Sequence, residues 1–405
     1  IIGGEGNDSV VAEQQGLPKT VIRWYDLATE NNGLTGSSTI RLKHSNRELK
    51  HEYDRKNFRY NITAPLFSFS YNRDDGVFLG AGIKTTRHGF RKEPYQWQQS
   101  FTASYAAATG AYNFRYLLDA PGFRFLANIK APNNTRNFFG MGNNSSFPNR
   151  GDQKIWHYRS RFNLVELAAL NKIRTIKKLS LLTGPVFQHY RIDQDDNEGK
   201  FILQPESGLN QDLLIEPKTY LGWQVQAAID NSNHPLMPSR GVRWQSFIRW
   251  VNGQSKHAYS FTQMQGSLAY YISTGLPAKL VLAGRIGAGL NTGKFEFFQS
   301  QTLGGSENLR GFRNYRFAGS AMAFHNLDLR VKIADINGYI LPGTVGLLLF
   351  HDIGRVWLKG ESSGIWHNGW GAGIWLAPAG RVVVTASYAG SKESGLPFLS
   401  LGFQF

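Results

Sequence analysis

The chain has 405 residues, no cysteine and a formal net charge of +16, and each of these numbers excludes a class of protein. Without cysteine there are no disulfides, no thiolate-bound metals and no thiol nucleophiles. The longest apolar run, from Val345 to Phe350, is far shorter than the ~20 residues that a membrane helix needs. The 45 Lys and Arg residues are spread along the chain, so we expect them to line a polar interior or a membrane surface rather than to bind nucleic acid.

Residues 1–60 are turn-rich and charged, notably in stretches 3–9, 31–38 and 43–56. No initiator methionine and no signal peptide are visible, so we expect a mature or trimmed product. We predict that residues 1–60 form a pre-barrel periplasmic segment or the end of an upstream domain. Residues 61–405 are predicted to form a separate domain, a transmembrane β-barrel, for the reasons that follow.

From residue 61 onward, apolar and polar side chains alternate with the period of a β-strand. In residues 240–251, for example, Val242 and Trp244 alternate with Arg243 and Gln245. The same alternation recurs in residues 122–130, 220–230 and 321–333, and the 44 glycines fit many turns. These segments are predicted to be strands with one apolar face and one polar face.

Two architectures fit such strands, a soluble β-sandwich and a membrane barrel. The alternating segments reach about 10 residues, which is the length that spans a membrane, whereas strands of soluble proteins average about 5–6. Trp and Tyr lie toward the strand ends, as in the aromatic girdles of membrane barrels. The polar faces carry Arg and Lys, which are too charged for the core of a sandwich. The barrel is therefore favoured.

We predict sixteen antiparallel strands whose connections alternate in length. The predicted strands begin near Pro65, Val77, Gln96, Ala111, Gly122, Lys154, Ile176, Lys218, Gly241, Ala258, Ala278, Ala321, Gly343, Gly369, Gly380 and Pro397. The long connections, 131–153, 192–216, 292–320 and 353–368, all follow odd-numbered strands, whereas the connections after even-numbered strands are mostly tight. This separation is typical of outer-membrane barrels, with long outer loops and short periplasmic turns.

The first and last strands are predicted to meet in a weak seam. Pro65 and Pro397 each remove one hydrogen-bond donor from the ladder at this junction. The chain ends at Phe405, and Leu399, Leu401 and Phe403 share its face in an extended strand. This terminal strand resembles the signal that the outer-membrane assembly machinery reads, although Ser400 stands where that signal often has glycine.

The segment with the clearest motif is residues 303–312, Leu-Gly-Gly-Ser-Glu-Asn-Leu-Arg-Gly-Phe, in the connection after the eleventh strand. Its Leu309, Arg310, Gly311 and Phe312 resemble the loop-six motif of the BamA/TamA-type barrel superfamily, also called bacterial surface antigens. Two strands later, Phe350, Asp352 and Gly354 resemble the Phe-x-Asp-x-Gly strand of that family. The turns at residues 230–241, 370–373 and 378–380 resemble the family as well.

The resemblance implies that the long loop after the eleventh strand folds into the barrel lumen. Period two places Phe350, Asp352 and Gly354 on one face of their strand. If that face lines the lumen, Asp352 can pair with Arg310, since a guanidinium fork matches a carboxylate in geometry and charge. Gly311 would let the loop backbone approach the wall closely.

A narrower resemblance covers residues 69–76, 88–92 and 138–143. These segments are similar to barrels of Bacteroidota-type bacteria that follow a calcineurin-like metallophosphoesterase domain. The metal motifs of that phosphoesterase do not occur in this sequence. The scattered histidines predict no zinc site, and no serine-nucleophile elbow or phosphate loop is present. We therefore expect no enzyme activity, no cofactor and no metal in residues 1–405.

Three functions remain open. The superfamily resemblance implies insertion or translocation of proteins at the bacterial outer membrane, with lipids, lipopolysaccharide, client polypeptides and other outer-membrane assembly subunits as partners. The narrower resemblance implies a membrane anchor or conduit for an upstream hydrolase domain. The third function is a diffusion porin, but an open porin lumen gives the Arg-Gly-Phe loop no role.

Overall fold

The structure is a computed structural model, and it describes residues 2–3, 6–11, 22–35, 40–44, 59–72, 76–89, 94–147, 155–173, 178–275, 279–338 and 342–405. The chain divides into two units. One comprises residues 1–63 with 85–98, and the other comprises residues 64–84 with 99–405. Within the described ranges, no helix is long and apolar enough to cross a membrane.

The first unit contains four short strands that pair in parallel. They are β1 (Ser9–Val11), β2 (Ile22–Asp26), β3 (Gly33–Thr35) and β4 (Ile40–His44). β1 pairs with β3, and β2 pairs with β4. The Trp24 side chain is completely buried and packs with Ile40. The predicted boundary near residue 60 and the pre-barrel role of this segment stay predictions.

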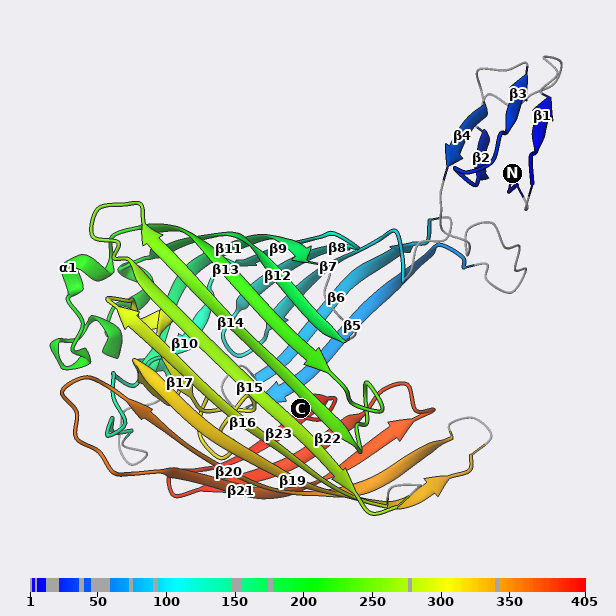
Figure 1. Cartoon of the computed structure of the whole chain (residues 1–405). Coiled ribbons are helices and arrows are strands. Elements are labelled where there is room, and N and C mark those ends of the chain that lie inside the picture. Colours follow the sequence, from blue (N-terminus) through cyan, green and yellow to red (C-terminus); the bar gives the residue numbers. More distant parts are fainter. Residues whose placement is uncertain are drawn as a thin grey trace. The chain divides into compact units, whose positions relative to one another are not determined.

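Apart from one short strand, β10 (Thr135–Asn137), the main sheet is the predicted sixteen-stranded antiparallel barrel (Figure 1). Its strands are β5 (Ile62–Asn72), β6 (Gly76–Arg87), β7 (Trp97–Ala106), β8 (Ala111–Ala120), β9 (Phe123–Lys130), β11 (Arg159–Ile173), β12 (Leu179–Ile192), β13 (Lys218–Asp230), β14 (Gly241–Gly253), β15 (Phe261–Ser273), β16 (Leu280–Gly293), β19 (Ala321–Ile336), β20 (Gly343–Trp357), β21 (His367–Pro378), β22 (Val384–Ser391) and β23 (Gly395–Leu401). Each strand pairs with the next one, and β23 returns to β5. The predicted fold is confirmed.

The predicted strand positions differ from the observed ones mainly at the ends. The predicted starts at Lys154, Ile176 and Ala278 lie outside the described residues. β20 continues to Trp357, although the sequence predicted a loop from residue 353. The reason is the ladder with β19, in which Ala321 still pairs with Trp357. Backbone pairing therefore extends the strand beyond the point where its apolar alternation weakens.

Side chains on the outer face of the barrel are apolar, whereas those on the lumen face are polar or are packed against other residues inside the barrel. Along β20, Leu347 and Leu349 face outward and are 43% and 49% exposed, whereas Leu348 and Phe350 face inward and are buried. Large apolar side chains exposed to solvent would be unfavourable in a soluble protein, but they suit the lipid-facing surface of a membrane barrel. The alternation read from the sequence thus separates the lipid face from the lumen face.

One end of the barrel, here called the loop end, carries the long connections. The connection 131–158 contains β10 (Thr135–Asn137) and η3 (Ile155–Tyr158). The connection 193–217 contains η4 (Asp195–Asn197), η5 (Phe201–Leu203), η6 (Pro205–Ser207) and α1 (Gln211–Leu214). The connection 294–320, here called the inner loop, contains η7 (Phe297–Gln299), β17 (Gln301–Leu303) and β18 (Phe317–Gly319).

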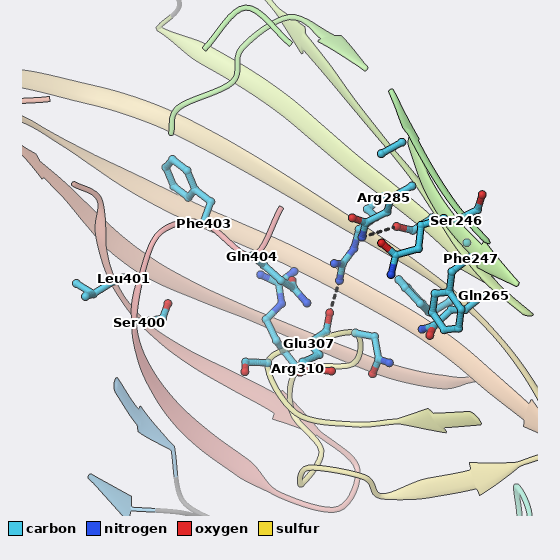
Figure 2. Close-up of a pocket in the computed structure, with 18 of the residues that line it drawn as sticks. Ser246, Phe247, Gln265, Arg285, Glu307, Arg310, Ser400, Leu401, Phe403 and Gln404 are labelled. Atoms are coloured by element: carbon cyan, nitrogen blue, oxygen red, sulfur yellow. Dashed lines mark hydrogen bonds between the residues drawn. The ribbon is translucent and has the colours of Figure 1, made fainter. Parts of the chain in front are cut away.

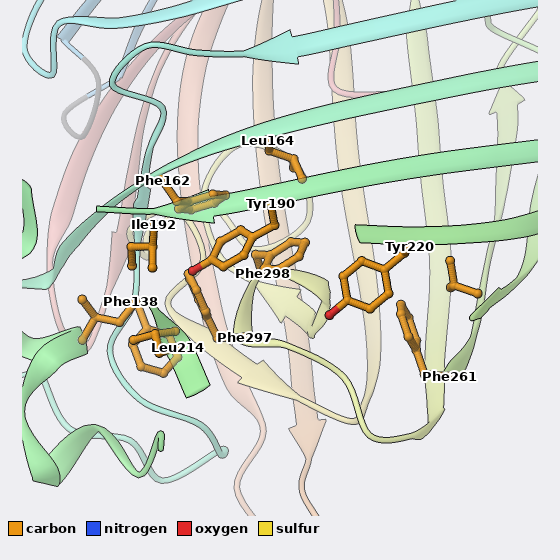
Figure 3. Close-up of a cluster of buried hydrophobic side chains, with 12 residues drawn as sticks. Phe138, Phe162, Leu164, Tyr190, Ile192, Leu214, Tyr220, Phe261, Phe297 and Phe298 are labelled. Atoms are coloured by element: carbon orange, nitrogen blue, oxygen red, sulfur yellow. The ribbon is translucent and has the colours of Figure 1, made fainter. Parts of the chain in front are cut away.

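The long connections share an apolar cluster with the inner barrel wall. Figure 3 shows Phe138 and Leu214 from two connections facing Phe297 and Phe298 of the inner loop. The ring of Phe298 stacks on Tyr190 of β12, with ring centroids 4.4 Å apart. Aromatic packing of this kind contributes roughly 0.5–1.5 kcal/mol per pair beyond area burial. The cluster therefore fixes the inner loop to the wall near the loop end.

Candidate functional site

The inner loop is folded against the lumen face of β19 and β20. Leu303, Leu309 and Phe312 are completely buried, and they pack on inward-facing Met322, Phe324 and Val356 together with Phe317. β17 and β18 pair with each other, so the two ends of the loop are joined before the chain enters β19. Apolar burial and a local ladder thus hold the loop inside the barrel.

Arg310 is the polar centre of the inner loop. Its Nε and Nη2 donate to the two carboxylate oxygens of Asp352 at 2.7 and 2.6 Å, and its backbone N–H donates to the same group at 2.8 Å. Its Nη2 also donates to Asp328 at 2.8 Å. The guanidinium lies 3.7 Å from the centre of the Phe350 ring. One buried cation is therefore held by two carboxylates and one aromatic face.

The positions of the partners follow from strand period and register. Asp352 lies two residues after Phe350 on the lumen face of β20, and Asp328 of β19 is the ladder partner of Phe350. Both carboxylates are fully buried. Two buried anions beside one another would be costly, and Arg310 offsets this cost for both. The structure thus brings together the motif residues Arg310, Phe350 and Asp352.

The other motif residues make close backbone contacts. Gly311 has a φ of 91°, and a Cβ there would lie 2.6 Å from the carbonyl oxygen of Gly390. A Cβ at Gly354 would lie 2.8 Å from a methyl group of Leu303. These glycines let the inner loop touch β20 and β22 without displacement.

Three polar residues of this site were not singled out as site residues in the sequence. Asp328 is the second carboxylate, and Arg330 donates to it at 2.9 Å. Asn326 accepts from Arg285 of β16 at 2.8 Å and donates to the carbonyl of Asn308 at 2.8 Å. Alternation already placed Asn326, Asp328 and Arg330 on the polar face of β19, but it carries no information about their partners across the lumen.

Gly369 of β21 provides a test of how closely the inner loop fits. A Cβ at this position would lie 1.8 Å from the carbonyl oxygen of Arg310, so Gly369→Ala must displace the loop or the strand. We expect this substitution to lower the free energy of unfolding by about 1–3 kcal/mol, the usual cost of overpacking. Urea unfolding in lipid vesicles measures it. Gly364→Ala is the matched control, because a Cβ there meets open space; an equal effect of both substitutions contradicts the close fit.

A cavity of about 670 Å³, lined by both polar and apolar side chains, lies beside the inner loop. Its lining includes Arg124, Gln226, Gln245, Arg285, Arg310 and Phe403. Figure 2 shows Arg285, Glu307, Phe403 and Gln404 around this space. Other lining residues, such as Ser180 of β12 and Thr385 of β22, lie near the strand ends opposite the loop end. Among the described residues, no group of three or more His, Cys, Asp or Glu is placed to hold a metal ion.

The loop end is tied together by hydrogen bonds between four connections. Arg316 of the inner loop donates to both carboxylate oxygens of Glu393 at 2.7 and 2.8 Å, and to Ser145 Oγ at 2.9 Å. Glu361 accepts from the backbone N–H groups of Asn143 and Asn144 at 2.7 Å each. Desolvation in the connection 193–217, aided by Arg161, lowers the pKa of Lys200 to about 8. The hydrogen bonds of Arg316 and Glu361 thus hold these connections together.

The seam between β5 and β23 is short in the part of the chain that the structure describes. Among the described residues, these strands pair at one position, Leu399 with Tyr71, whereas the β22–β23 ladder joins seven residue pairs. The predicted seam residues Pro65 and Pro397 lie in β5 and β23. Within the described parts of β5 and β23, the facing edges therefore carry backbone groups that this ladder does not pair.

The third predicted seam residue, Phe405, lies elsewhere. The expected extension of the terminal strand through Phe403 and Phe405 is wrong, because β23 ends at Leu401. Gly402 has a φ of 99°, and its N–H donates to the carbonyl of Val383 at 2.6 Å. This turn sends residues 403–405 into the lumen, where Arg330 contacts both aromatic rings.

A barrel of sixteen strands with an apolar outer face, and with a buried Arg–Asp centre on an inward-folded loop, defines a class of outer-membrane barrels. The chain belongs to the Omp85 superfamily, because the Omp85 superfamily domain matches residues 24–405. The protein is accordingly a bacterial outer-membrane barrel of the BamA/TamA type.

Solved structures show the same fold. BamA from Haemophilus ducreyi lacking POTRA domains 1–3 is 14% identical, with a TM-score of 0.58 over 85% of this chain and 70% of that chain. CdiB from Escherichia coli is 13% identical, with a TM-score of 0.51 over 85% of this chain and 63% of that chain. The present chain thus spans less than two thirds of that CdiB. The comparison with curated proteins found no match.

Proposed function

We propose that this barrel inserts or translocates proteins at the outer membrane and that the β5–β23 seam is its working edge. The observation that carries the proposal is that, among the described residues, one pair, Leu399 with Tyr71, joins the two strands. Unpaired strand edges present N–H and C=O groups that can accept another strand by backbone pairing. The mechanism is therefore physical: the edge templates an incoming strand while the hydrocarbon region penalises any backbone group left unpaired.

The inner loop contributes rigidity in this proposal. Its Arg310 joins β19 and β20 through Asp328 and Asp352. Two strands, β21 and β22, separate this wall from β23 at the seam. A stiff wall at β19 and β20 directs opening to the seam. The partners are unfolded client polypeptides, together with outer-membrane lipids, lipopolysaccharide and other assembly subunits.

Reconstitution of the purified chain into lipid vesicles tests the proposal. An unfolded barrel client is added, and its conversion to a protease-resistant, heat-modifiable form is followed with time. We expect faster conversion than in vesicles that contain an unrelated barrel. Equal rates would contradict an insertion function and would favour the anchor role for an upstream hydrolase domain.

The alternative function, a diffusion porin, predicts a high conductance of the unaltered protein. The tied loop end supports a barrel that passes little current in a planar bilayer, and Arg316→Ala is expected to raise this current because it frees Glu393 and Ser145. Arg381→Ala, on an exposed turn, is the matched control. A large conductance in the unaltered protein that Arg316→Ala leaves unchanged would support the porin instead.

A further inference from the structure

Four basic side chains gather where β11 and β12 reach the loop end. Arg159 and Arg161 lie at the start of β11, Arg191 lies near the end of β12, and Lys200 follows η4. We call these four residues the basic cluster. Asn197 of η4 accepts from the backbone N–H of Arg161 at 2.8 Å and donates to its carbonyl at 2.7 Å. The backbone N–H of Lys200 donates to the Asn197 carbonyl at 3.0 Å, so η4 holds Lys200 next to the start of β11.

The strand residues of the basic cluster face away from the lumen. Phe162 and Tyr190 are buried and pack on Phe298 of the inner loop inside the barrel. Because successive side chains of a strand point to opposite faces, the neighbouring Arg161 and Arg191 point outward. The basic cluster therefore faces the surroundings of the barrel.

The outer face becomes apolar within a few residues of the basic cluster. Val165 of β11 pairs with Ile129 of β9, which is 38% exposed. Leu167 pairs with Phe187 of β12, and Phe187 pairs in turn with Leu221 of β13. In a membrane barrel such side chains contact acyl chains, and the long connections lie on the outer side. The basic cluster thus lies where acyl chains give way to the headgroups of the outer leaflet.

The charges of the basic cluster are not neutralised within the protein. In the described part of the chain, none of Arg161, Arg191 and Lys200 forms an ion pair with a carboxylate. Desolvation, with Arg161 and Arg159 close by, lowers the pKa of Lys200 to about 8 against the opposing effect of Asp196. The acidic side chains of this connection are exposed to solvent: Asp193, Asp195, Asp196 and Glu198. Exposed carboxylates are screened, so an anion bound among the cations would offset their repulsion more strongly.

We propose that the basic cluster binds a phosphate group of an outer-leaflet glycolipid whose acyl chains lie on the apolar outer face of β9, β11 and β12. The guanidinium groups of Arg161 and Arg191 match phosphate oxygens in geometry, and Lys200 adds a point charge. Outward positions of one strand are about 7 Å apart, so Arg159 and Arg161 reach the same headgroup. This inference goes beyond the proposed function, because it assigns a ligand to a part of the wall that client assembly does not use.

Binding of fluorescent lipid A to the full chain in an uncharged detergent tests the site. We expect bisphosphorylated lipid A to bind at least tenfold more tightly than the same lipid with both phosphates removed. Arg191→Gln with Lys200→Gln is expected to raise the Kd for the phosphorylated lipid on the order of tenfold. Arg161→Gln, which also gives up a hydrogen bond to the Thr109 carbonyl, is a second variant with an effect in the same direction.

Arg240→Gln with Arg381→Gln is the matched control. It removes the same number of charges from exposed turns at the end opposite the loop end. All variants are first shown to be folded by heat-modifiable mobility in electrophoresis. Equal binding of the two forms of lipid A, or an equal loss of affinity in both double variants, would overturn the site. Displacement of lipid A by equimolar inorganic phosphate would show that the ligand is free phosphate and would overturn the glycolipid.

Discussion

Arg310→Ala is expected to lower the free energy of unfolding of the barrel by about 3–5 kcal/mol, the usual cost of removing one partner from a buried ion pair. The substitution leaves Asp352 fully buried without its bidentate donor and leaves Asp328 with Arg330. It also removes the contact with the Phe350 ring. The midpoint and slope of urea unfolding in lipid vesicles measure the change.

A double substitution distinguishes the contribution of the ion pair from the contribution of the volume of the Arg310 side chain. Arg310→Met combined with Asp352→Asn keeps much of the volume and removes the uncompensated charge at Asp352. We expect the double variant to recover a substantial part of the lost stability, because replacing both partners costs less than stranding one of them. A loss below about 1 kcal/mol for Arg310→Ala, in the range of a surface pair, would show that the centre does not hold the loop.

Locking the seam is expected to abolish client assembly. Leu399 and Tyr71 are ladder partners, and the ~4.5–5.5 Å between Cα atoms of such partners suits a disulfide. Leu399→Cys with Tyr71→Cys under oxidising conditions therefore closes the one junction that the proposed mechanism opens. We expect the assembly rate to fall to that of vesicles without the protein and to recover on addition of a reductant.

The control lock lies in a long ladder. Val225 of β13 and Ile248 of β14 are partners in a continuous run of pairs and face the lipid side. A disulfide between Val225→Cys and Ile248→Cys is expected to leave the assembly rate unchanged in either redox state. Equal inhibition by both disulfides would show that general stiffening of the barrel lowers the assembly rate. Full activity of the seam-locked protein would show that client assembly does not require the seam to open.

Much of the barrel can be predicted from the sequence because its outer face and its lumen face contact very different environments. Lipid on one face and a polar lumen on the other impose strict alternation, as in the outward Leu347 and Leu349 against the inward Leu348 and Phe350. The lumen contact of Arg310 with Asp352 was also expected from period two and the family resemblance. Strand ends were less certain because ladder pairing, not side-chain pattern, decides where a strand such as β20 ends.

The parts that the sequence did not predict depend on contacts between distant segments. Alternation put Phe403 on the same face as Leu401, and the reversal arises at Gly402, whose positive φ is a property of the folded backbone. The dual role of Asp328 depends on Arg310 and Arg330 approaching it from two different elements. Likewise, Arg316 reaches Glu393 across 77 positions of the chain, and no local pattern marks that pair.

Direct capture of a client strand on β5 tests the central claim most closely. A single cysteine is placed at Phe69, on β5 two residues before the seam residue Tyr71, and a stalled client carries one cysteine in its last strand. We predict a disulfide-linked product at Phe69→Cys during assembly and none at Ile248→Cys, which faces lipid within the long β13–β14 ladder. Client assembly that proceeds at a normal rate with no product at Phe69→Cys, or with equal products at both positions, would contradict a seam-templated mechanism.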